Sequence, residues 1–473
     1  MSETQLRAFR SKQASLWQSA VDKVAADAPP APSPAAGGFG DEAAAPPSGR
    51  TTPGDPDLVA SLAAADEMAA QLDAGETIQI PPAPGEGAVG FMDTVGFCSK
   101  TALRIAEARV KSIFTGDTTE LKVLQEEIGA KFGQCDIRWT QVIAEYVKNR
   151  VGSVHIPYRV HTNLSDFTIT GSRFPNDAKI AIMADWGTGD GAARGILKQI
   201  AAKNPDVVIH LGDVYYSGAE HEFREYFCPI WRDGLGLPDI AWGKTATAAA
   251  LTARPATFTL SGNHDMYAGG GPYYTTLDML GQPASYFCLR NDQWQFVALD
   301  TGLHDSDPTQ SGKEVTFLEP TEIAWLKDKM ATADGRKTVL LSHHQLYTAF
   351  AGEKIGGGVT NQTLVDATQD ILPRVAAWFW GHEHNLVIFE KFQGVLGRCI
   401  GHGAFPVGKD ELSALIPGVP VKNVALETDN QGKGGLLQHG YVTIQLTGDQ
   451  AAVTYFQYDP VSGAEKQIFD EKL

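Results

Sequence analysis

The sequence is poor in cysteine, in long apolar runs and in basic side chains. Its five cysteines are an odd number among 473 residues, and no two of them form a Cys-x-x-Cys pair. This count and spacing exclude a disulfide framework and a thiolate zinc site. No run of 18 apolar residues occurs, and the N-terminus MSETQLRAFRSKQ lacks the apolar segment of a secretory signal. We therefore expect no membrane-spanning helix and a cytoplasmic location.

Basic residues are outnumbered by acidic ones, with Lys+Arg 39, Asp+Glu 56 and a formal net charge of -17. A general nucleic-acid binder needs a basic surface, so this charge balance argues against that class. It also argues against attachment to an anionic membrane surface. A local basic pocket remains compatible with the composition, so a small anionic substrate stays open.

The composition is that of an ordinary globular protein, with 43% hydrophobic and 20% charged residues, and the length allows two or three domains. Helical spacing of apolar residues predicts a helix over 1–27 and a helical region over 58–155. The segment 28–57 is rich in Pro, Gly and Ala and is predicted to be a flexible linker. The helices could cover an active site, mediate self-association or bind a protein partner, and the sequence leaves this choice open.

After residue 151 short apolar runs alternate with helix-like segments, which is typical of an α/β fold whose sheets are covered on both faces. A hairpin is predicted at the C-terminus, in YVTIQLTGDQAAVTYFQYDP. The predicted strands are 178–185, 206–213, 256–265, 295–302, 337–344 and 376–384.

Polar clusters follow nearly every strand between 178 and 384. They are Asp185-Trp186-Gly187, Gly212-Asp213-Val214-Tyr215-Tyr216, Gly262-Asn263-His264-Asp265, His343-His344 and Gly381-His382-Glu383-His384. Because ligands bind beyond the carboxyl ends of strands in open α/β sheets, these ends would place carboxylates, an amide and several imidazoles in one pocket. Such donors suit divalent or ferric ions, and there are enough of them for two ions that share a bridging carboxylate.

The ordered set of five clusters resembles the calcineurin-like metallophosphoesterase superfamily, over about 175–460. The resemblance implies that 160–473 form a four-layer α/β/β/α sandwich, preceded here by an N-terminal helical extension. It also implies a hydrolase that acts on a small phosphorylated substrate and needs a dinuclear metal centre.

Two positions resemble the purple acid phosphatase branch. Gly187 stands where many relatives have a histidine ligand, and Tyr216 completes a G-D-x-x-Y pattern. The resemblance implies a first metal bound by Asp185, Asp213, Tyr216 and His384. It implies a second metal bound by Asp213, Asn263, His343 and His382. Iron(III) is expected in the first site if Tyr216 is a ligand, with Fe(II), Zn(II) or Mn(II) in the second.

The implied reaction is hydrolysis of a phosphate monoester by a metal-activated hydroxide. By resemblance His264 stabilises the transition state or protonates the leaving group, Asp265 orients its imidazole and His344 contacts the phosphoryl group. The SHHQ sequence leaves open whether His343 or His344 is the metal ligand, and we favour His343.

Alternatives remain at this stage. Tyr216 could be a core residue, in which case the first site would hold Mn(II), Zn(II) or Fe(II). A phosphodiesterase acting on cyclic nucleotides or glycerophosphodiesters would use the same ions. An inactive metal-binding scaffold is a third possibility, although no expected ligand is missing.

Overall fold

The computed structural model describes residues 155–473 except 190, 216, 307–315, 354, 356, 406, 408–413, 424–436 and 461. The predicted helix 1–27, the linker 28–57 and nearly all of the helical region 58–155 lie outside the described residues. Within the described ranges, no helix is both long and apolar enough to cross a membrane.

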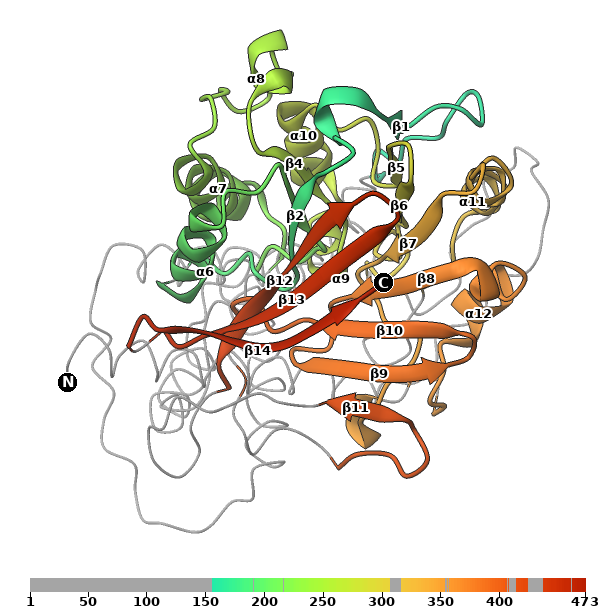
Figure 1. The fold of residues 1–473 in the computed structure, drawn as a ribbon. Helices are drawn as coiled ribbons and strands as arrows, with labels where there is room; N and C mark the ends of the chain where they lie inside the picture. The colour runs from blue at the N-terminus through green and yellow to red at the C-terminus, as the bar shows by residue number, and fades with distance from the viewer. Residues whose placement is uncertain are drawn as a thin grey trace, which may run out of the picture. The chain divides into compact units, whose positions relative to one another are not determined.

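Two mixed β-sheets form the centre of the described region (Figure 1). The first has the strand order β1 (Thr168–Ile169), β5 (Phe287–Arg290), β6 (Trp294–Ala298), β7 (Lys337–Leu341), β8 (Val375–Trp380), β10 (Val395–Ile400), β9 (Leu386–Phe392) and β11 (Val421–Asn423). The second has the order β14 (Glu465–Lys472), β13 (Gln450–Tyr458), β12 (His439–Thr447), β2 (Lys179–Met183), β3 (Val207–His210) and β4 (Ala256–Thr259).

Helices cover the outer face of each sheet. On the second sheet they are α6 (Gly191–Ala202), a π-helical turn (Glu222–Phe227), α7 (Cys228–Leu235) and α10 (Gly271–Leu280), with the short α8 (Ala248–Thr252) and α9 (Asn263–Tyr267) nearby. On the first sheet they are α11 (Pro320–Ala331) and α12 (Gln362–Thr368). Short 3-10 turns occur at 171–173, 351–353 and 372–374.

The hydrophobic core has three layers, as a four-layer sandwich requires. Between the sheets, alternate residues of both interlock, among them Ile180, Ile209, Phe296 and Phe379. The side chains between them on β2 and β3 face α6, α7 and α10 instead. A third cluster joins the outer face of the first sheet to α11 and α12. The predicted α/β/β/α order is therefore confirmed for the described residues.

The strands end where their apolar runs end, and this positions the polar clusters. β2, β3 and β4 pair in parallel, as do β6, β7 and β8. Because parallel strands end at the same edge of a sheet, the predicted site residues after β2, β3, β4, β7 and β8 gather at one edge. The predicted C-terminal hairpin is also confirmed, since β12 and β13 pair antiparallel.

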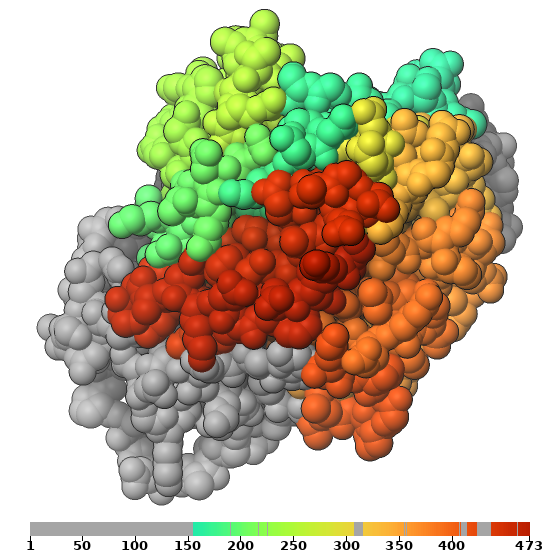
Figure 2. Space-filling model, in the orientation of Figure 1, coloured from blue at the N-terminus to red at the C-terminus, as the bar shows by residue number. Residues whose placement is uncertain are grey.

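A buried ion pair fastens the last strand to the opposite sheet. Arg398 on β10 donates from Nε and Nη2 to the two carboxylate oxygens of Glu471 on β14, each at 2.6 Å. Tyr455 donates to the same carboxylate at 2.7 Å. In Figure 2 the residues of β12–β14 (red) fill the surface between those of α6–α8 (green) and of β8–β10 (orange).

Replacing Glu471 by alanine is expected to destabilise the protein by roughly 3–5 kcal/mol, because it leaves the Arg398 guanidinium buried and unpaired. The Arg398 side chain is only 1% exposed, so its guanidinium has little contact with water. Urea unfolding measures the loss. The double variant Arg398→Met/Glu471→Leu should recover most of it, and a loss below about 1 kcal/mol in the single variant would contradict the role of the pair.

Candidate metal centre

Six predicted ligands from five loops converge at the carboxyl edge of the two sheets. Asp185 follows β2, Asp213 follows β3, Asn263 begins α9, His343 follows β7, and His382 and His384 follow β8. The four ligands before β8 are at most 1% exposed, whereas His382 and His384 are half-buried. One ligand atom from each of Asp185, Asp213 and His343 lies within 4.8 Å of the others.

Three of these ligands have a left-handed backbone. The φ angles are 54° at Asp185, 77° at Asp213 and 65° at His382. Residues with a side chain rarely adopt this conformation, which is unfavourable by about 1–3 kcal/mol at each position. Local strain of this kind gathers at functional sites, where it aims side chains that a regular strand would point elsewhere.

Glycines beside the ligands allow two loops to meet. Gly212 has a φ of 104°, and a Cβ added there would lie 2.6 Å from the Gly262 nitrogen and 2.8 Å from Nδ1 of His343. At Gly381 an added Cβ would lie 2.5 Å from the Asp185 carboxylate. Glycine is therefore needed at residue 212 for its backbone angle as well as for space, and at residue 381 for space.

The first group of ligands surrounds a tyrosine hydroxyl. The Tyr215 hydroxyl oxygen lies 3.0 Å from Oδ1 of Asp185 and 3.0 Å from Oδ2 of Asp213, so its single proton is shared between two acceptors, and it lies 2.9 Å from Nε2 of His384. Nε2 of His384 is also 3.3 Å from Oδ1 of Asp185. Phe405 stacks on the His384 ring at a centroid distance of 4.2 Å and fixes its plane.

The second group centres on the amide oxygen of Asn263. This Oδ1 lies 3.1 Å from Nε2 of His343 and 3.2 Å from Nδ1 of His382. The Asn263 amide nitrogen donates to Tyr267 at 2.6 Å, which orients the oxygen toward the histidines. Nδ1 of His343 lies 2.9 Å from the Leu211 carbonyl oxygen, so its Nε2 faces the site. The choice of His343 over His344 as the ligand stays a prediction.

Tyr215 is the site residue that the sequence reasoning missed. The predicted ligand was its neighbour Tyr216, which lies outside the described residues. A Cβ added to Gly187 would lie 2.6 Å from the Asp213 carbonyl oxygen and 2.7 Å from the Val214 Cα. No histidine fits at residue 187, and the Tyr215 phenol lies beside the first group. The repeated tyrosine in GDVYY was the available signal, but helical or strand spacing does not say which ring faces inward.

His264 and Asp265 occupy different surroundings. The His264 ring lies between Tyr215 and Tyr267, at centroid distances of 4.7 and 4.9 Å, and its Nε2 is 4.0 Å from Oδ2 of Asp213. Asp265 accepts hydrogen bonds from the backbone nitrogens of Asp213, Val214 and Gly262, at 2.9, 3.1 and 2.7 Å. None of these three contacts is with the His264 imidazole, which Asp265 was predicted to orient. The carboxylate instead ties together the loops after β3 and β4.

Burial shapes the charges of the site. It raises the pKa of Asp185 to about 6 and also raises the pKa of Asp213. Burial, with the neighbouring histidines, lowers the pKa of His343 to about 3 and the pKa of His382 well below its usual range. The imidazoles are thus neutral at pH 7, as metal ligands must be. Carboxylate, amide and imidazole donors fit iron, zinc or manganese ions.

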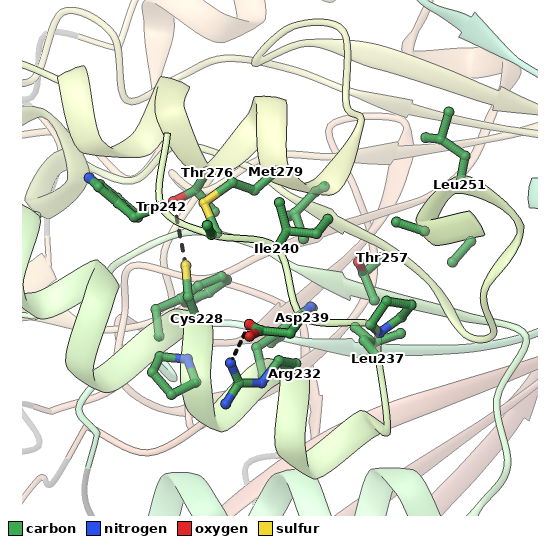
Figure 3. A pocket seen from close by; sticks show the side chains of 18 of the residues that line it. Cys228, Arg232, Leu237, Asp239, Ile240, Trp242, Leu251, Thr257, Thr276 and Met279 are labelled. Carbon is green, nitrogen blue, oxygen red and sulfur yellow. Dashed lines mark hydrogen bonds and ion pairs between the residues drawn. The ribbon is translucent and has the colours of Figure 1, made fainter. Parts of the chain in front are cut away.

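A separate cavity lies between α7, α10 and the segment 237–242 (Figure 3). Its volume is about 220 Å³, and none of the predicted site residues lines it. Its walls are mostly apolar, and its charged Arg232 is paired with Asp239 (Figure 3). The chemistry predicted from the sequence therefore belongs to the strand-end site and not to this cavity.

Comparison with known proteins gives a family match. Residues 178–386 match the family model described as calcineurin-like phosphoesterase. No curated protein sequence matches the chain. Similar solved structures include a dimetal phosphatase from Danio rerio, which is 13% identical in sequence. The match covers 63% of this chain and 99% of that chain, with a TM-score of 0.38. PhoD is similar at 11% identity, with coverage of 63% and 72% and a TM-score of 0.36.

Metal binding at this site is expected to weaken in acid. With a pKa of about 6, Asp185 is protonated below that pH and must release its proton to a bound ion. The association constant of the first metal should fall by at least about tenfold per pH unit below about pH 6, because Asp213 also gains a proton in this range. Equilibrium dialysis from pH 7.5 to 4.5 measures the slope. The variant Asp185→Asn should bind more weakly with a flatter slope, and a wild-type affinity that does not change with pH would contradict the assignment.

Proposed function

We propose that the protein is a dinuclear phosphomonoesterase of purple-acid-phosphatase type. Residues 178–386 belong to the calcineurin-like phosphoesterase family, which makes the chain a hydrolase of phosphate esters. The observation that carries this proposal is the convergence of the two ligand groups around Asp213. Its Oδ2 is 3.0 Å from the Tyr215 hydroxyl in the first group, and its Oδ1 is 3.4 Å from Nε2 of His343 in the second. One carboxylate oxygen thus faces each group, as a bridging ligand requires.

The first metal ion would be held by Asp185, Asp213 and His384 with a tyrosine, and the second by Asp213, Asn263, His343 and His382. When bound, the two ions supply a nucleophile at neutral pH and neutralise the phosphoryl oxygens. Four of the six ligands are at most 1% exposed, and such burial strengthens the attraction between ions and phosphate. The missing histidine at residue 187 and the tyrosine beside Asp185 favour the purple-acid-phosphatase type, and with it a monoester substrate.

The tyrosine gives the first site its metal preference. Burial and the two adjacent carboxylates raise the pKa of Tyr215 well above 10, so the phenol is a neutral donor in the metal-free protein. A strongly polarising ion such as Fe(III) would displace this proton and take the phenolate as ligand. The predicted role of Tyr216 is therefore proposed for Tyr215, with Fe(II), Zn(II) or Mn(II) in the second site.

The two tyrosines can be separated by spectroscopy. Protein purified without chelator should contain about two metal ions per chain, including iron, and show a broad visible band from the tyrosinate. We expect Tyr215→Phe to lose the band and Tyr216→Phe to keep it. The reverse pattern would return the ligand role to Tyr216, and a colourless wild-type protein with two metals would leave the centre without tyrosinate iron.

Substrate class is tested with a chromogenic monoester and a diester in parallel. We expect turnover of the monoester to exceed that of the diester, and His382→Ala to abolish both by removing a ligand. His221→Ala is the control and should remain active, because His221 is not a predicted ligand and its ring contacts Tyr226. Faster diester hydrolysis would favour a phosphodiesterase, and a metal-free protein without turnover after reconstitution would favour a scaffold.

His264 is proposed to donate a proton to the leaving group. Its ring is 1% exposed and lies beside Asp213, within the site and outside both ligand groups. His264→Ala is expected to lower kcat by roughly 100- to 10,000-fold on an ester with a poor leaving group. The loss should be much smaller for nitrophenyl phosphate, and metal content should stay near that of the wild type. An equal loss for both esters would exclude the general-acid role.

A further inference from the structure

The loop Asp300–Asp305, which follows β6, contacts the loops that carry the second ligand group. We propose that Thr301 and Asp305 position His344, and that His344 in turn holds the ring of His382 in place for the second metal ion. Thr301 and Asp305 are positioning residues in this inference, which rests on the proposed dinuclear site.

Both ring nitrogens of His344 are engaged by this loop. Its backbone nitrogen donates to Thr301 Oγ1 at 3.0 Å, and its Nδ1 lies 3.1 Å from the same oxygen. Its Nε2 lies 3.0 Å from Oδ2 of Asp305. All groups are satisfied if the Thr301 hydroxyl donates to Nδ1 and Nε2–H donates to Asp305. The ring then has no nitrogen left for a metal ion, and its direction is set at both ends.

The face of the His344 ring packs against the predicted metal ligands. Its centroid is 4.5 Å from that of His382 and 4.9 Å from that of His343. His382 has a left-handed backbone, and its Nδ1 must stay near Asn263 Oδ1, now 3.2 Å away. If His344 turned, the His382 ring would lose the surface that fixes its plane. Partners of this kind commonly tune metal affinity by 10- to 100-fold.

The loop itself is anchored to the turn that carries Asn263. Asp300 accepts from Ser261 Oγ and, at 3.0 Å, from the Leu303 backbone nitrogen. A Cβ added to Gly302 would lie 2.7 Å from the Gly262 carbonyl oxygen, so the two turns are in direct contact. Asp305 is 3% exposed, and a carboxylate so buried is costly unless it is bonded. Its contact with His344 meets this need and connects the loops after β4, β6 and β7.

The test uses metal-free full-length protein titrated with Mn²⁺, with the affinity of each ion measured separately. Asp305→Ala is expected to weaken one ion, the same one that His382→Ala weakens, by 10- to 100-fold and to leave the other within about threefold. Asp305→Asn should restore most of the affinity, because its amide oxygen can still accept from Nε2. Thr301→Val removes the other contact of the ring and should weaken the same ion.

Glu319→Gln is the matched control, because Glu319 lies 2.8 Å from a histidine of the same segment, His304, which is not a predicted ligand. Its metal affinities should equal those of the wild type. Thermal unfolding of the metal-free proteins checks that each variant is folded. If Asp305→Ala does not fold, the metal affinities of Thr301→Val decide the test.

The outcomes separate this inference from the proposed function. Wild-type protein that binds fewer than two ions would overturn both. Two ions bound as tightly by folded Asp305→Ala and Thr301→Val as by the wild type would overturn the positioning role alone. A higher KM for the phosphate ester with unchanged metal affinity would also overturn it, because that result would place His344 on the substrate.

Discussion

The site depends on two buried carboxylates, Asp185 and Asp213, whose negative charges require a nearby positive charge. Among the described residues their ion-pair partners are histidines, and burial lowers the pKa of one of them, His343, to about 3. A phenol hydroxyl and backbone nitrogens contact the carboxylate oxygens, and burial raises the pKa of Asp185 to about 6. A metal ion would supply the positive charge that the protein does not. The arrangement is therefore better suited to binding cations than to stabilising the metal-free fold.

The sandwich supplies the rigidity that this arrangement needs. Two sheets end at one edge, and their cores fix the positions of the strand ends. Three of the six predicted ligands occupy left-handed turns, which are unfavourable locally and persist because the neighbouring loops leave no other path. Asp265 is one such restraint, since its carboxylate holds three backbone nitrogens of two different loops. Residues without direct contact to an ion thus determine where the ligands point.

The apolar runs predicted the buried strands for a physical reason, whereas the four-layer order was implied by the resemblance. Continuous apolar runs specify buried strands, and a polar residue after such a run must lie at a sheet edge, as Asp185 and Asp213 do. Side-chain direction within a tight turn has no such periodic signature. Tyr215 therefore could not be chosen over Tyr216, and the backbone contacts of Asp265 could not be foreseen. The contact between Asp305 and His344 joins residues 39 positions apart and needs the fold to be visible.

The central claim is that one carboxylate, Asp213, joins two metal ions at the edge of the sheets. Anomalous diffraction from crystals of protein purified without chelator tests it directly. We predict two metal peaks, one beside Asp185 and His384 and one beside Asn263 and His343, with an Asp213 oxygen directed at each. A single peak, or a Tyr215 hydroxyl that stays within hydrogen-bond distance of both carboxylates with no metal beside it in metal-supplemented crystals, would contradict the account.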